Sequence, residues 1–136
     1  MNETLQPEGW AAPKGYANGM AADTAEGRLV FTGGQIGWNP ETCQFETDDF
    51  VEQTAQTLKN VAAILKSAGA EPRHLVRLTW YITDKTSYLE NQKEIGRAYR
   101  EVMGKHFPAM AVVVVAGLLE DRAKVEIEGT AVVPLS

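Results

Sequence analysis

Two strand-like runs near the carboxyl end constrain the fold of this chain more than any other feature. Residues 110–116 are apolar without interruption, whereas residues 124–133 alternate between apolar and polar side chains. Alternation indicates a strand with one buried face, and a continuous apolar run indicates a strand covered on both faces. The alternation places Glu126 and Glu128 on one polar face beside a buried neighbour. A carboxylate in such a setting forms an ion pair, is hydrated at the edge of a cleft, or is protonated and neutral. We therefore expect this position to take part in the chemistry of the protein.

Earlier segments carry the spacing of further strands and helices. The expected strands span residues 15–22, 28–36 and 73–83, and the expected helices span residues 48–68 and 87–103. The resulting order, β-β-α-β-α-β-β, predicts an α+β domain with a single mixed β-sheet and both helices packed on one face. The opposite face would then expose an apolar strand, so we expect further copies of the chain to cover it in a closed homo-oligomer.

Capping residues set the expected limits of the two helices. Thr47 or Asp48 can cap the first helix, and Gly69 can end it in a left-handed conformation. Ser87, with Glu90 three residues later, fits a capping box at the start of the second helix. Both helices therefore have a predicted start in the sequence itself.

Two strand features are more specific. The alternation at residues 73–83 predicts that four side chains face the core: Val76, Leu78, Trp80 and Ile82. The Gly33-Gly34 pair interrupts the strand at residues 28–36. Paired glycines indicate either a β-bulge or a close approach of another group to the backbone, and the sequence leaves both open.

Composition indicates one folded domain and argues against several classes of partner. The 136 residues are 44% hydrophobic and carry a formal net charge of −5. We expect an extended arm at residues 1–14 and a single domain at residues 15–136. An acidic chain without a basic cluster is a poor nucleic-acid binder. No apolar run is long enough to span a membrane, the amino terminus lacks a secretory signal and Cys43 is the one cysteine, so we expect a cytoplasmic protein.

The sequence offers little support for a metal or a thiol nucleophile. His74 and His106 have no partner at metal-binding spacing, and Cys43 has no activating base nearby in the sequence. His74 is expected at the surface, and His106 could reach the mouth of a cleft. We therefore expect neither a metal nor a cofactor.

Short motifs from about residue 13 to residue 133 resemble one family. They are Gly15-Tyr16, Thr-Gly-Gly-Gln at residues 32–35, Phe-Pro-Ala at residues 107–109 and Val-Glu-Ile-Glu at residues 125–128. Each motif alone is weak, but their joint order and spacing are specific. In these stretches the chain resembles the RidA family (reactive intermediate deaminase A, also called YjgF).

The resemblance implies a fold, an assembly and an activity. It implies a chorismate-mutase-like domain forming a homotrimer with a β-barrel-like centre and three clefts between subunits. Members with the full motif set hydrolyse small enamine or imine intermediates, releasing ammonia and a keto acid. By the same resemblance, Glu126 would position the attacking water, and Tyr16 and Gly33 would line the same cleft.

Five positions mark the expected cleft or depart from the family pattern. Met110 stands where the family has an Arg that holds the substrate carboxylate, and Val112 stands where it has a Cys. Gly33 replaces a Ser, Gln92 replaces an Asn, and Tyr88 is the aromatic residue that precedes it. We take Met110, Val112, Tyr88 and Gln92, with Tyr16 and Gly33, as candidate substrate-binding residues.

The change at Met110 has a physical consequence for the ligand. A guanidinium offers a planar fork to a carboxylate, and losing such a contact costs roughly 2–5 kcal/mol of binding. We therefore expect the usual 2-imino acids to bind poorly and a thioether-lined site to prefer an apolar or aromatic ligand. The missing hydroxyl at Gly33 should also enlarge the site.

Three functions remain open at this point. The first is an enamine or imine deaminase with altered substrate preference, and the second is a trimer that binds a small metabolite without turnover. RNA cleavage is a third, which the acidic charge disfavours. A purely structural alternative pairs Glu126 and Glu128 with Lys124, Arg122 or Arg77 of a neighbouring copy.

Overall fold

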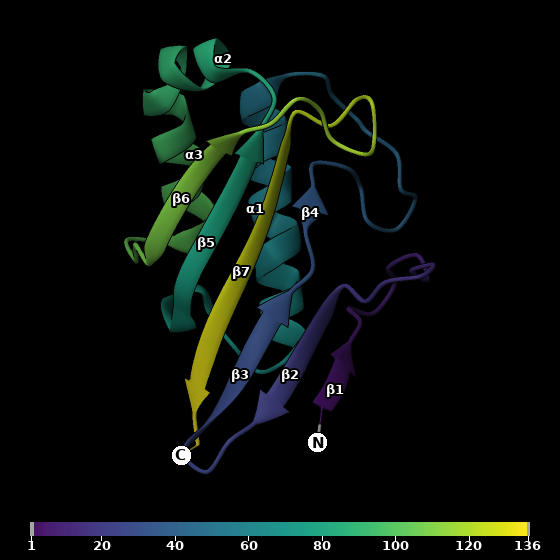
Figure 1. The fold of residues 1–136 in the computed structure, drawn as a ribbon, viewed down its shortest axis with the longest axis vertical. Coiled ribbons are helices and arrows are strands. Elements are labelled where there is room, and N and C mark those ends of the chain that lie inside the picture. The colour runs from purple at the N-terminus through teal and green to yellow at the C-terminus, as the bar shows by residue number, and fades with distance from the viewer. Residues whose placement is uncertain (1, 136) are drawn as a thin grey trace.

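Strand β7 (Val125–Pro134) lies in the middle of the sheet and joins its two halves (Figure 1). The structure is a computed structural model that describes residues 2–135. In that part of the chain the strands are ordered β1-β2-β3-β7-β5-β6, and the short β4 also pairs with β7. The other strands are β1 (Asn2–Leu5), β2 (Gly19–Asp23), β3 (Gly27–Thr32), β4 (Gln35–Ile36), β5 (Leu75–Ile82) and β6 (Ala109–Val114). The β5–β6 pair is parallel and the other pairs are antiparallel, so the expected mixed sheet is confirmed.

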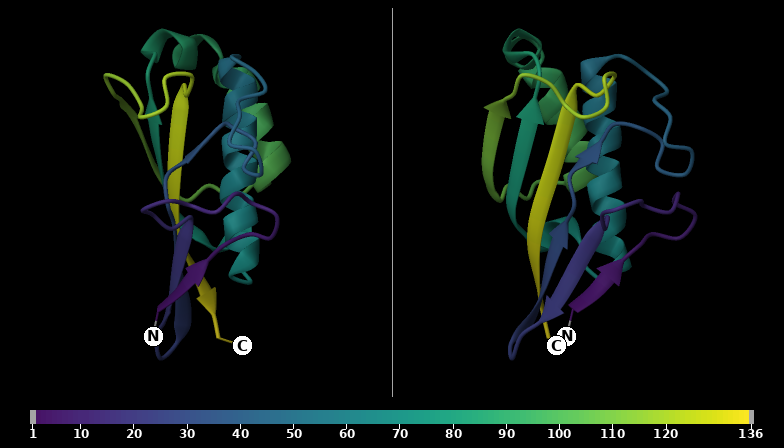
Figure 2. Two further views of the ribbon diagram at one scale, coloured as in Figure 1. Left: turned by 90° about the vertical axis from the view of Figure 1, so that its right-hand side faces the viewer. Right: turned by 45° about the vertical axis from the view of Figure 1, so that its right-hand side comes forward.

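The long helices cover one face of this sheet, as Figure 2 shows from the side. The helices are α1 (Phe50–Ser67), α2 (Lys85–Glu90) and α3 (Gln92–Met103), with a 3₁₀ turn at Pro72–His74. Helix α1 buries a stripe that includes Leu58, Val61 and Leu65 against the sheet. The alternation of β7 is confirmed as well, because Val125 and Ile127 are fully buried beneath the helices. The α+β class and the placement of the helices are therefore as expected.

The expected second helix is two helices, which corrects the prediction of one helix at residues 87–103. Asn91 has φ −120° and ψ 20°, and its side-chain amide donates to the carbonyl of Ser87. This geometry ends α2 and turns the chain into α3. The cap also differs: Asp84, rather than Ser87, accepts hydrogen bonds from the first turn of α2, so the helix begins earlier.

The first long helix also starts slightly later than predicted. Its cap is Asp49, whose carboxylate accepts a hydrogen bond from the backbone of Glu52, and neither Thr47 nor Asp48 fills that position. Thr47 instead accepts a hydrogen bond from the backbone of Asp49. At the other end Gly69 adopts φ +76°, as expected for a left-handed cap.

A register shift in β5 corrects one predicted core residue. Between Leu75 and Arg77 the pairing with β7 slips by one residue, so Leu75 is buried and Val76 is 48% exposed. A bulge adds one residue to a strand, and the side chains on either side of it no longer follow a single alternation between the two faces. Leu78, Trp80 and Ile82 face the core as predicted.

Strand β6 is open to solvent in the single chain, although its sequence predicts burial on both faces. It forms an edge of the sheet, and Met110 is 39% exposed while Val114 is 51% exposed.

Residues 2–5, expected within an extended arm, form β1 at the opposite edge and pair with β2. None of the helices within residues 2–135 has the length and apolar character needed to cross a bilayer.

Candidate functional site

A hollow of about 390 Å³ opens where the β3–β4 turn faces the first residues of β7. One wall comes from the segment before β2 and from residues 33–36, and another comes from Trp38. The β6–β7 loop contributes Leu119 and Glu120 at the rim, and Glu126 projects from β7. We call this space the cleft. Its surface is mostly apolar, with a few polar groups placed at defined points, which is typical of a small-molecule site.

Glu126 is the half-buried carboxylate of the cleft. In β7 it lies opposite Ile36 of β4 on one side and Tyr81 of β5 on the other. Burial raises the pKa of Glu126 above the ordinary carboxyl value, and the negative charge of Glu128 raises that pKa further. No hydrogen bond or ion pair to another described side chain holds the Glu126 carboxylate. The group is therefore available to a ligand or water and is easier to protonate than a surface glutamate.

The glycine pair shows both features that the sequence left open. Three residues, 32–34, lie opposite residues 128–129 of β7, which is a bulge, and the glycines also make room for two close approaches. A methyl group on Gly34 would lie 2.6 Å from Oε2 of Glu126. A methyl group on Gly33 would lie 2.6 Å from the carbonyl oxygen of Ala17, and the Gly33 amide donates to the carbonyl of Asn18 at 2.7 Å. The expectation that Gly33 enlarges the site is therefore wrong, since backbone atoms occupy the space.

Buried amides hold the floor of the cleft. Gln35 donates through Nε2 to Oδ1 of Asn18 and to the carbonyl of Gly33. From α1, the Asn60 side chain donates to the carbonyls of Ile36 and Trp38, both at 3.0 Å. These bonds tie the turn to the helix behind it. A ligand would therefore meet a preformed surface.

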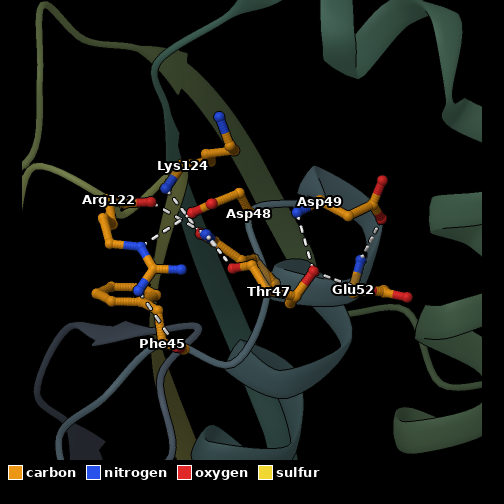
Figure 3. A network of polar contacts seen from close by, with 8 residues as sticks. Phe45, Thr47, Asp48, Asp49, Glu52, Arg122 and Lys124 are labelled. Carbon is orange, nitrogen blue, oxygen red and sulfur yellow. Dashed lines mark hydrogen bonds and ion pairs between the residues drawn. The ribbon is translucent and has the colours of Figure 1, made fainter.

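The rim loop is held at its carboxyl end by α1 (Figure 3). Gln53, fully buried, donates to the carbonyls of Thr47 and Arg122 and accepts from the backbone amide of Lys124 at 2.9 Å. Arg122 forms an ion pair with Asp48 at 2.9 Å. This network fixes the end of the loop that carries Leu119 and Glu120 to the cleft.

The second acid of the strand has a partner within the chain. Glu128 accepts a hydrogen bond of 2.9 Å from the hydroxyl of Tyr81. That bond is the main reason that the pKa of Tyr81 is raised. Arg122 is bound to Asp48, so the structural alternative in which it pairs with Glu126 or Glu128 is not what the chain forms.

The candidate residues fall into two groups. Tyr16, Gly33 and Glu126 line the same cleft. The others do not line it, and they lie toward the β6 side of the sheet: Met110, Val112, Tyr88 and Gln92. Tyr88 packs edge-on against Trp80, with ring centroids 6.5 Å apart. Within one chain, the expected binding set is therefore divided.

Sequence reasoning missed several residues of the cleft. Trp38, Leu119 and Glu120 line it from loops without a recognisable pattern, and Asn18 lies in a short connection before β2. Loop residues of this kind reach a site through the path of the backbone, which periodicity does not predict.

The two histidines have structural partners, and Cys43 lies beside a smaller hollow that shares Tyr16, Asn18, Gln35 and Trp38 with the cleft. Nε2 of His106 lies 2.8 Å from the carbonyl of Leu75, and Nδ1 of His74 accepts the backbone amide of Glu71. Cys43 is half-buried beside a smaller hollow, with φ +57°. Among residues 2–135, no three potential ligands of the His, Cys, Asp or Glu type gather closely enough to hold a metal.

Comparison with known proteins places this geometry in a family. The family model described as Endoribonuclease L-PSP matches residues 10–133. The human 2-iminobutanoate/2-iminopropanoate deaminase is 30% identical over 105 residues, which cover 77% of this chain and 73% of the human protein. The chain belongs to the RidA/YjgF family. The predicted membership is thus confirmed over nearly the whole sequence.

Solved structures of RidA/YjgF family members share the fold. YyfA from Yersinia pestis, described as a Rid family protein of unknown function, superposes with a TM-score of 0.80 at 28% identity, covering 96% of this chain and 98% of that one. E. coli TdcF, solved with bound serine, gives a TM-score of 0.77 at 30% identity over the same shares. The α+β architecture is therefore that of the RidA/YjgF family.

Proposed function

We propose that this chain is a deaminase that hydrolyses a reactive enamine or imine and releases ammonia, with Glu126 as the catalytic residue. The observation that carries the proposal is Glu126 itself: a half-buried carboxylate with a raised pKa in a preformed, largely apolar cleft. The similarity to a human protein named as an iminobutanoate and iminopropanoate deaminase supports the same reaction class. The proposal places no metal or cofactor in the reaction.

The reaction needs one group that accepts and returns a proton. Water adds to the carbon of the protonated C=N bond, a C–O bond forms, and the proton lost by the water passes to the Glu126 carboxylate. Glu126 then returns that proton to nitrogen. As the C–N bond breaks with its electron pair leaving on ammonia, the Glu126 carboxylate takes the hydroxyl proton, so that a carbonyl product remains, and this proton then passes to ammonia to give ammonium. A carboxyl group with a raised pKa suits both halves of this exchange.

We further propose that the working unit is a homotrimer with three clefts between subunits and a β-barrel-like centre. Two observations support this assembly. Strand β6 presents an apolar, exposed edge, and apolar edges of this kind are normally covered. The division of the candidate residues also fits, because the β6 side of one copy would bring Met110 and Tyr88 to the cleft of another. The domain at residues 15–136 would be the assembling unit, with residues 1–14 as an arm that adds β1.

Ammonia release tests the proposed reaction. Imines are generated in situ, from amino acids by an amino acid oxidase and from monoamines by an amine oxidase, and ammonia is followed with and without the protein. We expect acceleration for at least one imine and a loss of about 100-fold or more in Glu126→Gln, since general acid–base groups contribute that much. The variant should remain folded and assembled. Equal rates for both proteins on every imine would contradict the proposal.

One observation favours a second candidate, a binding protein without turnover. Met110 stands where an active relative would hold a carboxylate with Arg, so the cleft has lost a means of positioning that group. Such a protein would gain thermal stability from a ligand while leaving it unchanged. RNA cleavage, suggested by the family description, is disfavoured by the net charge of −5 and by the acidic cleft.

A further inference from the structure

The charged side chains of the cleft are all acidic. Glu120 at the rim and Glu126 on β7 are its ionisable carboxylates, and within the described part of the chain no basic residue lines it. The nearest basic residue along the loop is Arg122, which is bound to Asp48 and to the carbonyl of Phe45. A ligand that enters this cleft therefore meets two carboxylates and no basic side chain among the described residues that line it.

The apolar walls strengthen that preference. Tyr16 and Trp38 contribute aromatic surface, and Ile36 and Leu119 contribute aliphatic surface. The face of an aromatic ring carries partial negative charge and attracts organic cations, most strongly for Trp. The combination of aromatic rings with carboxylates is the chemistry that recognises an ammonium or iminium group attached to an apolar body.

An anionic substrate would bind weakly in the same cleft. The carboxylate of a 2-imino acid would lie among Glu120, Glu126 and the nearby Glu128, and each pair of like charges in a partly buried site is unfavourable. Met110, if a second copy brings it to the cleft, adds no positive charge. A protonated imine without a carboxylate avoids this repulsion and offers the reacting carbon to water beside Glu126.

We propose that the substrate is a monocationic iminium derived from a primary amine, with an aromatic or branched apolar group and no carboxylate, and that Glu120 recognises its charge. Hydrolysis then converts R₂C=NH₂⁺ and water into a ketone or aldehyde and ammonium, with no other reactant. The reaction rests on the function proposed above, whereas the preference for a cation is a property of binding and is tested separately.

Backbone hydrogen bonds fix the loop that carries Glu120, so this residue can recognise the charge of a ligand. The loop leaves β6 with the amide of Val115 bound to the carbonyl of Ile82 at 2.8 Å. It returns to β7 through a turn in which the amide of Ala123 donates to the carbonyl of Glu120 at 3.0 Å, and the next bonds are those of Gln53. Glu120 therefore precedes a fixed turn, and the adjacent Asp121 is in the same loop but does not line the cleft.

Three ligands of similar shape and different charge test the proposal on the intact, assembled protein. Benzylammonium, benzyl alcohol and benzoate are titrated at low ionic strength, and dissociation constants are measured by calorimetry or NMR. We expect benzylammonium to bind about tenfold more tightly than benzyl alcohol and benzoate to bind least tightly. Benzoate binding as tightly as benzylammonium would overturn the proposal.

A matched pair of variants locates the effect. Glu120→Gln should weaken the binding of benzylammonium about 3- to 10-fold and leave that of benzyl alcohol unchanged, because it removes an exposed charge without removing the side chain. Asp121→Asn changes the net charge equally in the neighbouring position and should leave both ligands unchanged. Equal weakening by the two variants would show an effect of overall charge and would overturn the role of Glu120.

Turnover separates this inference from the proposed function. Ammonia release is compared between the imine of benzylamine and 2-iminopropanoate. Faster release from 2-iminopropanoate would support a deaminase and overturn the cationic substrate. If benzylammonium binds preferentially but no imine is hydrolysed, the preference for a cation stands and the deaminase proposal fails.

Discussion

The cleft region and the β6 edge lie on the same sheet but differ in how far one chain completes them. Around the cleft, the buried polar groups of Gln35, Gln53 and Asn60 find partners within the chain. Along β6, apolar side chains such as Val113 and Val114 face solvent and the outer edge of the strand is unpaired. The cleft can therefore be preformed within one chain, whereas the β6 edge still depends on association with another copy to be covered.

Placing a charge on the β6 edge gives the strongest test of this contrast. Val113→Asp should disrupt the proposed trimer almost completely, because a carboxylate would be buried in an apolar contact. Sedimentation of the variant should show a smaller species, and deaminase activity should fall with it. Leu135→Asp, at an exposed position beyond the end of β7, serves as the control and should leave assembly intact. An unchanged oligomer in Val113→Asp would remove β6 from the interface.

A methyl group at the cleft tests whether that region is as tightly formed as its contacts suggest. Gly34→Ala would bring a Cβ within 2.6 Å of Oε2 of Glu126, so the carboxylate must move. We expect kcat/KM to fall about 10- to 100-fold, since small displacements of catalytic groups have effects of this size. Gly117→Ala, where no atom lies within 4 Å of the added methyl, should retain wild-type kinetics. Full activity in Gly34→Ala would mean that the carboxylate is not fixed.

The buried amide behind the rim loop tests the internal completeness of the cleft region. Gln53→Ala removes hydrogen bonds to Thr47, Arg122 and Lys124 and leaves buried backbone groups without partners. We expect the free energy of unfolding to fall by about 2–4 kcal/mol, measured by urea denaturation at a fixed protein concentration. The exposed Gln44→Ala provides the comparison and should change stability little. A similar loss in both variants would contradict the role of the network.

The smallest expected effect concerns the pH dependence of the cleft. Glu128 raises the pKa of Glu126, so Glu128→Gln should lower that pKa. Because Glu126 must be ionised to accept the proton of water, activity rises as the pH rises through its pKa, and the acid limb of the pH–rate profile should move to lower pH. A limb that stays in place or moves to higher pH would show that the two acids do not interact in this way.

Patterning predicted the parts of the fold that depend on burial. The alternation of β7, the buried stripe of α1 and the left-handed Gly69 follow from one side of each element facing the core. Two predictions were wrong: that Val76 faces the core, and that residues 87–103 form one helix. The bulge at Val76 and the break at Asn91 depend on which hydrogen bonds the backbone forms locally, and the spacing of apolar residues does not encode that choice.

The cleft was predictable in part. Glu126 stood out because a carboxylate adjoined an apolar strand, and Tyr16 and Gly33 entered through the family resemblance. Glu120 and Trp38 could not be identified, since their positions depend on how loops fold over the sheet. The sequence also could not reveal that the backbone of Ala17 occupies the space beside Gly33.

The bonds at both ends of the β6–β7 loop have a practical consequence for redesign. Val115 is tied to β5 at one end and Arg122 to α1 at the other, so the residues between them can vary without disturbing the sheet. Leu119, 95% exposed, and Glu120 lie inside this window and touch the cleft. Libraries confined to those few codons would alter ligand preference while sparing the rest of the scaffold, which makes this loop the natural starting point for directed evolution.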